Sequence, residues 1–365
     1  MTSLHLRGTV LPEGELRDIW VVGGRLTFTR PSGGADTVVD GGYLLPGLVD
    51  AHAHLGHDPQ TMAFDAGRFT EAALAYAAAG TTLLRVPGHR APIPAGLRAD
   101  PRLPRLVTAG EWLAWSGLHD LDGPQSAPED LSAAAVAQAR ANDGWCKTYG
   151  DWEPFTPAVP AGVLRELCTA VHAAGGRVAA HCQTAEGTRN AVLAGVDSIE
   201  HAWYLTDDLL EVLAARGGAV TPTWSGFLPH VADVRTKPEG PRKDWFLGGV
   251  ESLRTATVAA HEAGVTVLAG TDSLAFGDVV TEIEHLVAAG LPGAAAVGAA
   301  SWDARRYLGF PGLSEAGAET DAEAGAEGAP ADLVAVADDP RRFPGVLRHP
   351  SLVLLSGTTA GTGYR

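Results

Sequence analysis

Residues 46–54 read Pro-Gly-Leu-Val-Asp-Ala-His-Ala-His, an apolar run that ends in two histidines. Side chains two residues apart on a β-strand point to the same face, so the imidazoles of His52 and His54 would lie side by side. Two neutral imidazoles that converge on one point suit a borderline metal ion such as Zn²⁺. The alternative is a loop or hairpin in which the two histidines are incidental.

From residue 44 onward, short apolar runs alternate with Ala- and Leu-rich helical stretches. Such alternation favours a parallel sheet whose strands are connected by helices. The runs that qualify as barrel strands cover residues 45–51, 82–86, 105–109, 145–149, 177–180, 198–200, 219–221 and 266–269. Because eight such units make a (β/α)₈ TIM barrel of about 250 residues, we predict an α/β fold with this barrel over residues 44–313.

The two ends of the chain have a different pattern, in which short β segments are separated by Gly and Pro turns. We expect residues 1–43 and 332–365 to form a small β-sandwich domain together. Residues 314–331 (SEAGAETDAEAGAEGAPA) are acidic and of low complexity, which predicts a solvated connector. Residues 222–244 are rich in Pro, Gly and Trp, and we expect a long irregular loop that could cover the active-site face as a lid.

Three further polar residues follow apolar runs, at the carboxyl ends of predicted strands. His181 follows RVAA, His201 follows DSIE, and Asp272 follows VTVLAGT. Barrel enzymes place their catalytic residues at this end of the strands. A lone histidine there is more often a hydrogen-bonded core residue, but four histidines and an aspartate at matching positions favour a metal site.

Lys147 ends the fourth predicted strand, in the segment WCKTY, and is one of only three lysines among 27 Lys and Arg residues. A desolvated lysine has a lowered pKa and a nucleophilic amine. Such an amine can react with carbon dioxide to give a carbamate, an anionic oxygen ligand able to bridge two metal ions. The alternative is a buried partner in an ion pair.

Together, PGLVDAHAH, Lys147, His181, His201 and Asp272 resemble the amidohydrolase superfamily. The spacing between His181 and His201, with AGVDSIEHAWYL around the latter, is similar to the prolidase and imidazolonepropionase branch. The tail ADLVAVADDP resembles the closing β segment of that family, so the resemblance extends over nearly the whole chain.

The resemblance implies hydrolysis of a C–N bond in an amide, cyclic amide or dipeptide-like substrate by a metal-activated hydroxide. Asp272 would be the general base, which accepts a proton from the water and passes it to the leaving nitrogen. Divalent metal is implied, with Zn²⁺ favoured: two ions per chain if Lys147 is carboxylated and one otherwise. The implied ligands are His52, His54 and Asp272 for the more buried metal, His181 and His201 for the second, and carboxylated Lys147 between them.

The same resemblance suggests which residues contact the substrate. His119, in SGLHD, matches a substrate-side histidine of the branch, and Tyr149 and Gln183 lie on neighbouring strand ends. Gln183 stands where prolidase-like members often carry a tyrosine that holds a substrate carboxylate, which counts against dipeptide cleavage. An apolar lining that would suit a bulky substrate is expected from Trp112, Trp115, Trp203 and Trp224.

Two alternatives remain open. A mononuclear centre of His52, His54, His181 and Asp272, with Lys147 uncarboxylated, would suit ring-opening of a cyclic amide or deamination. Deaminases of the superfamily usually place Glu three residues after the fifth-strand histidine, but here the nearest, Glu186, follows by five, so deamination ranks lower. The other alternative is a non-catalytic metal-binding protein on the same fold.

Composition narrows the choice of partners. A formal net charge of −16 argues against nucleic acid and against an anionic membrane surface, because both require clustered Lys and Arg. Three cysteines without C-x-x-C spacing predict neither a disulfide framework nor a structural zinc site, and a cytoplasmic location is expected. The expected partner is a small-molecule substrate, with a homo-oligomer left open.

Overall fold

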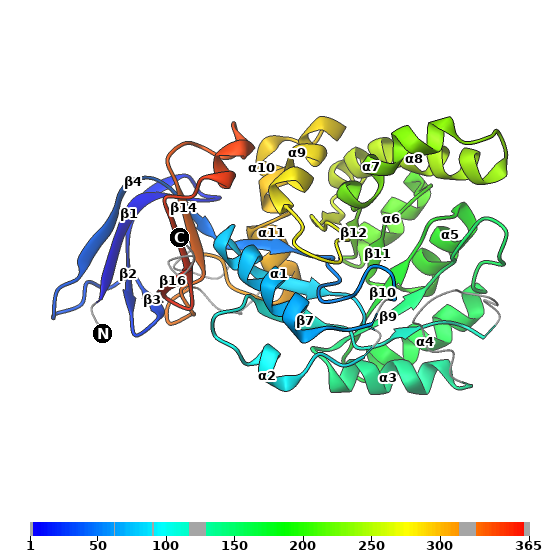
Figure 1. Cartoon of the computed structure of the whole chain (residues 1–365), viewed down its shortest axis with the longest axis horizontal. Coiled ribbons are helices and arrows are strands. Elements are labelled where there is room, and N and C mark those ends of the chain that lie inside the picture. Colours follow the sequence, from blue (N-terminus) through cyan, green and yellow to red (C-terminus); the bar gives the residue numbers. More distant parts are fainter. Residues whose placement is uncertain (1–2, 62, 90, 117–128, 314–325, 361–365) are drawn as a thin grey trace.

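The computed structural model describes residues 3–61, 63–89, 91–116, 129–313 and 326–360. Figure 1 shows a β-sheet at one end of the molecule, which contains both ends of the chain, and a larger body of strands and helices beside it. Within the described ranges, no helix combines the length and the hydropathy that crossing a membrane requires.

The sheet at the end of the molecule is built from both ends of the chain. β4 pairs in parallel with β1 on one side and antiparallel with β14 on the other, so the C-terminal strands extend the N-terminal ones. The described residues form one sheet here, and the second layer of the predicted β-sandwich is not shown. In sheet order the strands are β16 (Thr358–Thr359), β15 (Leu352–Leu355), β14 (Leu333–Val336), β4 (Asp36–Pro46), β1 (Leu4–Val10), β2 (Glu15–Val22) and β3 (Arg25–Thr27).

The larger body contains parallel strands in a three-stranded and a six-stranded sheet. Each of the eight predicted barrel runs overlaps one of these strands, because buried parallel strands are apolar along most of their length. The strands are β5 (Leu48–Asp50), β6 (Thr81–Val86) and β7 (Arg105–Thr108) in the first sheet, and β8 (Trp112–Leu113), β9 (Trp145–Tyr149), β10 (Arg177–His181), β11 (Ser198–Glu200), β12 (Ala219–Thr221) and β13 (Thr266–Val267) in the second.

Hydrogen bonds connect the two parallel sheets. Beyond β5, the Ala51 amide donates to the Ala269 carbonyl, which follows β13, at 2.8 Å, and Ala53 forms a parallel bridge with Ser273. On the other side, β8 follows β7 after three residues and pairs with β9. The first and last parallel strands therefore lie next to each other at their carboxyl ends, which brings sequence-distant polar residues together.

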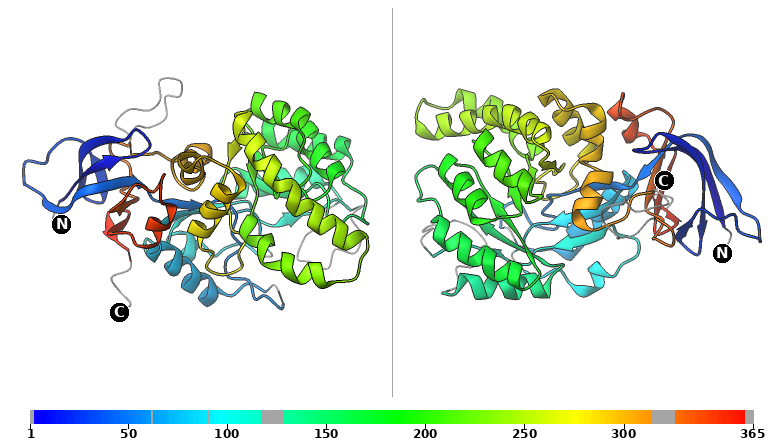
Figure 2. Two further views of the ribbon diagram at one scale, coloured as in Figure 1. Left: turned by 90° about the horizontal axis from the view of Figure 1, so that it is seen from above. Right: turned by 180° about the vertical axis from the view of Figure 1, so that it is seen from behind.

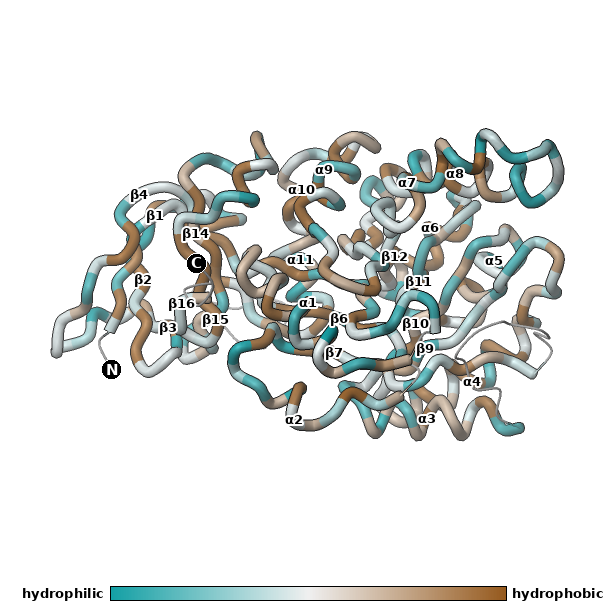
Figure 3. Tube along the Cα trace, in the orientation of Figure 1, coloured by the Kyte–Doolittle hydropathy of each residue, from teal (hydrophilic) through white to brown (hydrophobic). Residues whose placement is uncertain are grey.

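Helices cover the outer side of the parallel strands, as both views in Figure 2 show. In α4, for example, the buried residues Leu164, Leu167, Cys168 and Val171 recur at helical spacing and face the strands. Figure 3 shows hydrophobic colouring along the strands inside the body. Apart from α7 and α8, the helices are α1 (Ala66–Ala78), α2 (Ala95–Arg98), α3 (Leu131–Ala141), α4 (Ala161–Ala173), α5 (Ala185–Ala194), α6 (Asp207–Ala215), α9 (Val279–Ala289), α10 (Gly293–Gly298), α11 (Trp302–Leu308) and the 3₁₀ helix η1 (Pro344–Arg348).

The segment 222–244, predicted to be an irregular loop, is helical, so that prediction is wrong. It contains α7 (Trp224–Thr236) and the first turn of α8 (Pro241–Glu262). Pro241 is the first residue of α8, where a missing backbone N–H is tolerated. Glu282 accepts hydrogen bonds from the backbone amides of Trp224 at 2.9 Å and Ser225 at 2.8 Å, which satisfies the first turn of α7.

Candidate metal centre

His52 and His54 follow β5 and meet Asp272, which follows β13. The two Nε2 atoms are 3.2 Å apart, and each lies 3.4 Å from Oδ1 of Asp272. Backbone pairing holds this arrangement, because the Asp272 amide donates to the His52 carbonyl at 2.7 Å. Gly270 allows the close approach, since a Cβ there would lie 2.6 Å from Cβ of His52. These three residues form a group able to hold a metal ion.

The hydrogen bonds of the two histidines show that the group suits a cation. His52 Nδ1 donates to Glu200 Oε2 at 2.6 Å, and His54 Nδ1 donates to the Gly88 carbonyl at 3.2 Å. Both partners are acceptors, so each Nε2 carries a lone pair, and the two lone pairs face each other beside a carboxylate. Ligands about 2.0–2.1 Å from a tetrahedral ion lie about 3.3–3.4 Å from one another, which matches the observed triangle.

A buried ion-pair network lies behind His52. Arg85 on β6 reaches Glu200 at 2.5 Å and also donates to the Ala51 carbonyl at 2.6 Å and to Ser198 Oγ at 3.0 Å. Arg85 and Glu200 are 1% and 0% exposed. Burial raises the pKa of Glu200, but the nearby Arg85 and Lys147 charges outweigh it and leave that pKa below its usual value. Glu200 is therefore a fixed anion that sets the tautomer and orientation of His52.

His181 and His201 lie beside the His52 group. The ring centroids of His181 and His201 are 4.6 Å apart, and those of His52 and His201 are 5.2 Å apart. His201 Nδ1 shares a 2.8 Å hydrogen bond with Thr223 Oγ1, which leaves Nε2 as the free ring nitrogen. Nε2 of His181 is buried without a hydrogen-bond partner among the described residues. The chemistry of these two imidazoles therefore suits a second ion. The ligand atoms of His52, His54 and Asp272, in contrast, already lie within 4.8 Å of one another.

Lys147 on β9 is 2% exposed and lines the same cavity as the histidines. Burial lowers the pKa of its ammonium to about 8, while the negative charges of Glu200 and Asp272 act in the opposite direction. Burial in turn raises the pKa of Asp272, and the Lys147 charge opposes that shift. A lysine with a lowered pKa is a better nucleophile than an exposed one, as carboxylation requires.

Three residues of the site have left-handed backbone conformations. The φ angles are 67° at His201, 53° at Thr223 and 55° at Asp272. Such a conformation costs on the order of 1 kcal/mol or more for a residue other than glycine, and it persists only where surrounding contacts enforce it. His201 directly follows β11, and Thr223 and Asp272 lie in the segments after β12 and β13. The side chains of His201 and Asp272 line the cavity, and Thr223 contacts His201.

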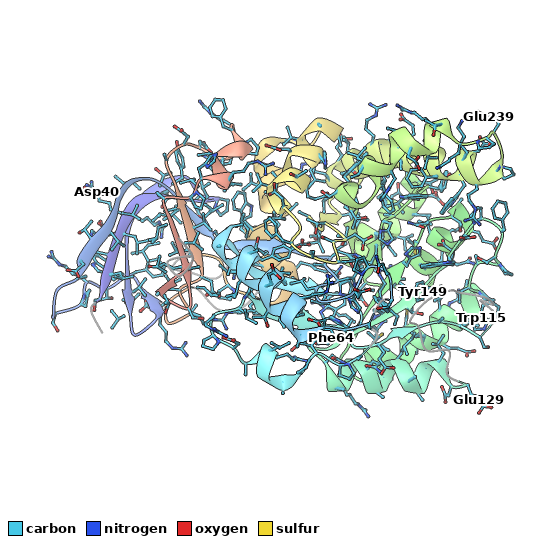
Figure 4. All side chains as sticks on the ribbon, viewed as in Figure 1. Asp40, Phe64, Trp115, Glu129, Tyr149 and Glu239 are labelled. Atoms are coloured by element: carbon cyan, nitrogen blue, oxygen red, sulfur yellow. The ribbon has the colours of Figure 1, made fainter. Side chains whose placement is uncertain are left out.

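The cavity at this site has a volume of about 320 Å³. Tyr149 and Gln183, for which a substrate contact is expected, line it, and Figure 4 shows Tyr149 within the body, with Trp115 farther toward its edge. His119 lies outside the described residues. Trp203 and Trp224 belong to the hydrophobic core. The lining residues are His52, His54, Trp112, Lys147, Tyr149, Trp152, His181, Gln183, His201, Asp272 and Leu274.

Sequence reasoning did not identify the residues that support the ligands. Glu200 directly precedes His201, and its position at a strand end was a usable signal. Asp151 accepts hydrogen bonds from the backbone amides of Gln183 at 2.8 Å and Thr184 at 2.9 Å, which fixes the chain just after His181. Gln183 and Thr184 are more than 30 residues from Asp151, and His52 and Arg85 are more than 100 residues from Glu200, so the fold is needed to show these contacts.

Comparison with known proteins agrees with this site. Residues 43–360 match the model of the amidohydrolase family. An uncharacterised protein of Mycobacterium tuberculosis (strain ATCC 25618 / H37Rv) is 37% identical over 98% of this chain and 96% of its own length. A Xaa-Pro dipeptidase structure has a TM-score of 0.78 at 20% identity, over 98% of this chain and 99% of that one. The ochratoxinase of A. niger has a TM-score of 0.80 at 18% identity, over 98% and 95%.

The protein is a hydrolase that acts on carbon–nitrogen bonds. It belongs to the amidohydrolase family, which confirms the resemblance stated on PGLVDAHAH and the strand-end residues. The likeness to the dipeptidase and to the ochratoxinase, both at 20% identity or less, is a likeness of fold.

Proposed function

We propose that the protein hydrolyses the C–N bond of an amide, cyclic amide or dipeptide-like substrate at a binuclear divalent metal centre, with Zn²⁺ as the favoured ion. The observation that carries this proposal is the triangle of His52 Nε2, His54 Nε2 and Asp272 Oδ1, with edges of 3.2 to 3.4 Å. The dipeptidase and the ochratoxinase, as their names state, point to hydrolysis in proteins of similar fold.

The metal would be held by His52, His54 and Asp272 at the first site and by His181 and His201 at the second. Bound there, divalent metal supplies polarisation of a carbonyl and a water of lowered pKa. Asp272 then serves as general base: its carboxylate accepts the proton of the water and returns it to the leaving nitrogen as the C–N bond breaks. Tyr149 and Gln183, which line the cavity, hold the substrate in place.

Lys147 is proposed to be the bridging ligand after carboxylation. Its neutral Nζ attacks the carbon of carbon dioxide, a new N–C bond forms, and one proton leaves to solvent. Burial favours the neutral amine that this step needs. The carbamate would be an anionic oxygen ligand among the four imidazoles, and it would help His52, His54, Asp272, His181 and His201 hold two divalent ions.

We further propose that the parallel strands close into a (β/α)₈ barrel over residues 44–313, with residues 1–43 and 332–365 as the accessory β domain and 314–331 as connector. The contacts from Ala51 to Ala269 and from Ala53 to Ser273 support closure, because they join the first strand to the eighth. In such a barrel the metal ligands all lie at the carboxyl ends of strands, where barrel enzymes carry out their chemistry.

Metal content of protein purified without chelator, measured with turnover on a panel of amides, lactams and dipeptides, tests this proposal. About two ions per chain, with turnover that disappears on chelation and returns with metal, is the expected result. One ion per chain with an unmodified Lys147 would replace the binuclear centre with a mononuclear one. No metal under metal-replete conditions would overturn the proposal, and bound metal without turnover would favour a non-catalytic metal protein.

A further inference from the structure

Aromatic rings stand at both ends of the histidine cluster. The Trp112 ring lies 5.2 Å from His54, and the Trp152 ring lies 5.2 Å from His181, measured between centroids. Between them, each imidazole contacts the next at 4.6 to 5.2 Å. The continuous row is Trp112, His54, His52, His201, His181 and Trp152.

The position of the indoles determines what lies on either side of a bound amide. An amide whose carbonyl lay over the central imidazoles would have its acyl part toward one indole and its amine part toward the other. The Trp112 side chain has little freedom to move, because it is 6% exposed and packs directly on Gly88, where a Cβ would lie 2.3 Å from the ring. Trp152 is only partly buried, and its ring meets Tyr149 edge-on at 5.5 Å, so it has a face for a ligand.

Charge in the cavity disfavours an anionic substrate. Lys147 is the only Lys or Arg among the described residues that line it, and the charges of Glu200 and Asp272 already act on it. Arg242 pairs with Glu153, in the loop that carries Trp152, at 2.8 and 3.0 Å. The formal net charge of −16 repels anions in addition. With Lys147 carboxylated as proposed, the described lining has no Lys or Arg side chain to bind the free carboxylate of a dipeptide, apart from the metal ions that the reacting carbonyl would contact.

We infer that the substrate is an uncharged amide with apolar groups on both sides of its C–N bond, and that Trp152 stacks on a flat ring of that substrate. A cavity of about 320 Å³ lies at the lower end of the range for small-molecule sites, which fits a ligand with one or two rings. This inference rests on the proposed function, since it names the substrate class of the same site.

Two p-nitroanilides with a common leaving group test the charge preference. Phenylacetyl-p-nitroanilide is neutral, and glutaryl-p-nitroanilide carries a carboxylate. We expect kcat/KM of the metal-loaded protein to be at least tenfold higher for the neutral compound. Equal or better cleavage of the glutaryl compound, or of a free dipeptide, would overturn the inference while leaving the hydrolase proposal in place.

Binding measurements test the role of Trp152 without turnover. Isothermal titration of the metal-free protein with N-benzylbenzamide should show affinity about tenfold weaker in Trp152→Ala and near the starting value in Trp152→Phe. Phe155→Ala is the matched control, because Phe155 lies in the same loop, is 57% exposed and does not line the cavity. Unchanged affinity in Trp152→Ala would overturn the inference.

The two proposals fail in different ways. If N-benzylbenzamide binds in a Trp152-dependent manner but the metal-loaded protein cleaves no amide, the proposed hydrolysis fails and the ligand class stands. If amides are cleaved but Trp152→Ala binds and cleaves as the unmodified protein does, the ligand class fails and the hydrolysis stands.

Discussion

His52 donates from Nδ1 to Oε2 of Glu200 over 2.6 Å, although the two residues are 148 positions apart in the chain. Glu200 in turn accepts from Arg85 and from Ser198 Oγ, both at 2.5 Å. Every member of this network is 1% exposed or less, so no water competes with it. The result is a histidine whose Nε2 points at Asp272 with little freedom to rotate.

Glu200→Gln tests this relationship. The amide keeps the shape of the side chain but removes the negative charge that fixes the His52 tautomer and neutralises Arg85. We expect metal affinity to fall by about 10–100-fold, as for other residues that orient a metal-bound histidine. Competition with a chromogenic chelator measures this affinity. Glu211→Gln, on the exposed face of α6, is the control and should leave affinity unchanged.

The same variant should also unfold more easily. Arg85 would remain buried without a charged partner, and breaking a buried ion pair typically costs about 3–5 kcal/mol. Denaturant unfolding of the metal-free protein separates this effect from lost metal binding. Metal affinity that stays at its original value in Glu200→Gln would show that Glu200 serves the fold and not the orientation of His52.

Much of the strand layout was predictable, because short, mostly apolar runs such as RVAA in β10 alternate with helical stretches. This alternation and the positions of Lys147 within β9, His181 at the end of β10 and His201 directly after β11 are local signals. The Arg85–Glu200 pair was not predictable, since Arg85 reads as an interruption of the apolar run of β6 and its partner lies 115 residues away. The role of Arg85 is visible only in the fold, where its side chain on β6 reaches Ser198 and Glu200 on β11.

The helices in segment 222–244 were not predictable for a different reason. Pro229 lies inside α7, and a proline in that position argues against a helix when only the sequence is considered. Tertiary contacts override this preference, because Glu282 on α9 fixes the first turn of α7 through Trp224 and Ser225. Pro241 was a usable signal for the start of α8, but the preceding glycine and proline suggested a loop instead.

Lys147→Gln tests the bridging carbamate. Glutamine cannot be carboxylated, so we expect about one metal ion per chain in place of two, measured by elemental analysis of protein saturated with Zn²⁺ and then desalted. Lys237→Gln is the control, since the Lys237 side chain is 56% exposed and pairs with Asp233 on α7, away from the cavity lining. Two tightly bound ions in Lys147→Gln would remove Lys147 from the ligand set.

Gly270→Ala tests the close approach of the first and last parallel strands. An added Cβ would lie 2.6 Å from Cβ of His52 and 2.9 Å from its backbone nitrogen, so His52 must move. We expect a loss of about 1–3 kcal/mol in unfolding free energy, as for other overpacked sites, together with weaker metal binding. Chemical denaturation and chelator competition measure the two effects.

The control for that variant is Gly162→Ala. Gly162 lies in α4 with no atom within 4 Å of the position of its Cβ, and alanine favours a helix by about 0.5–1 kcal/mol over glycine. Gly162→Ala should therefore be neutral or slightly stabilising and should bind metal normally. If both variants had the same unfolding free energy and metal affinity, the close contact with His52 would not be the reason for a glycine at position 270.

Asp272→Asn separates proton transfer from metal binding. The amide oxygen still faces Nε2 of His52 and His54, but an amide cannot accept the proton of a water at neutral pH. We therefore expect kcat to fall by about 10²–10⁴-fold, the range for loss of a general base, while metal content and KM remain close to their original values. Steady-state kinetics on the neutral anilide and elemental analysis of the same preparation provide the two readouts, with the exposed Asp233→Asn as control. Because the two readouts are independent, a variant that loses metal and activity together assigns Asp272 to binding alone. If the variant keeps both metal and activity, Asp272 is not the general base, and another group in the cavity must accept the proton.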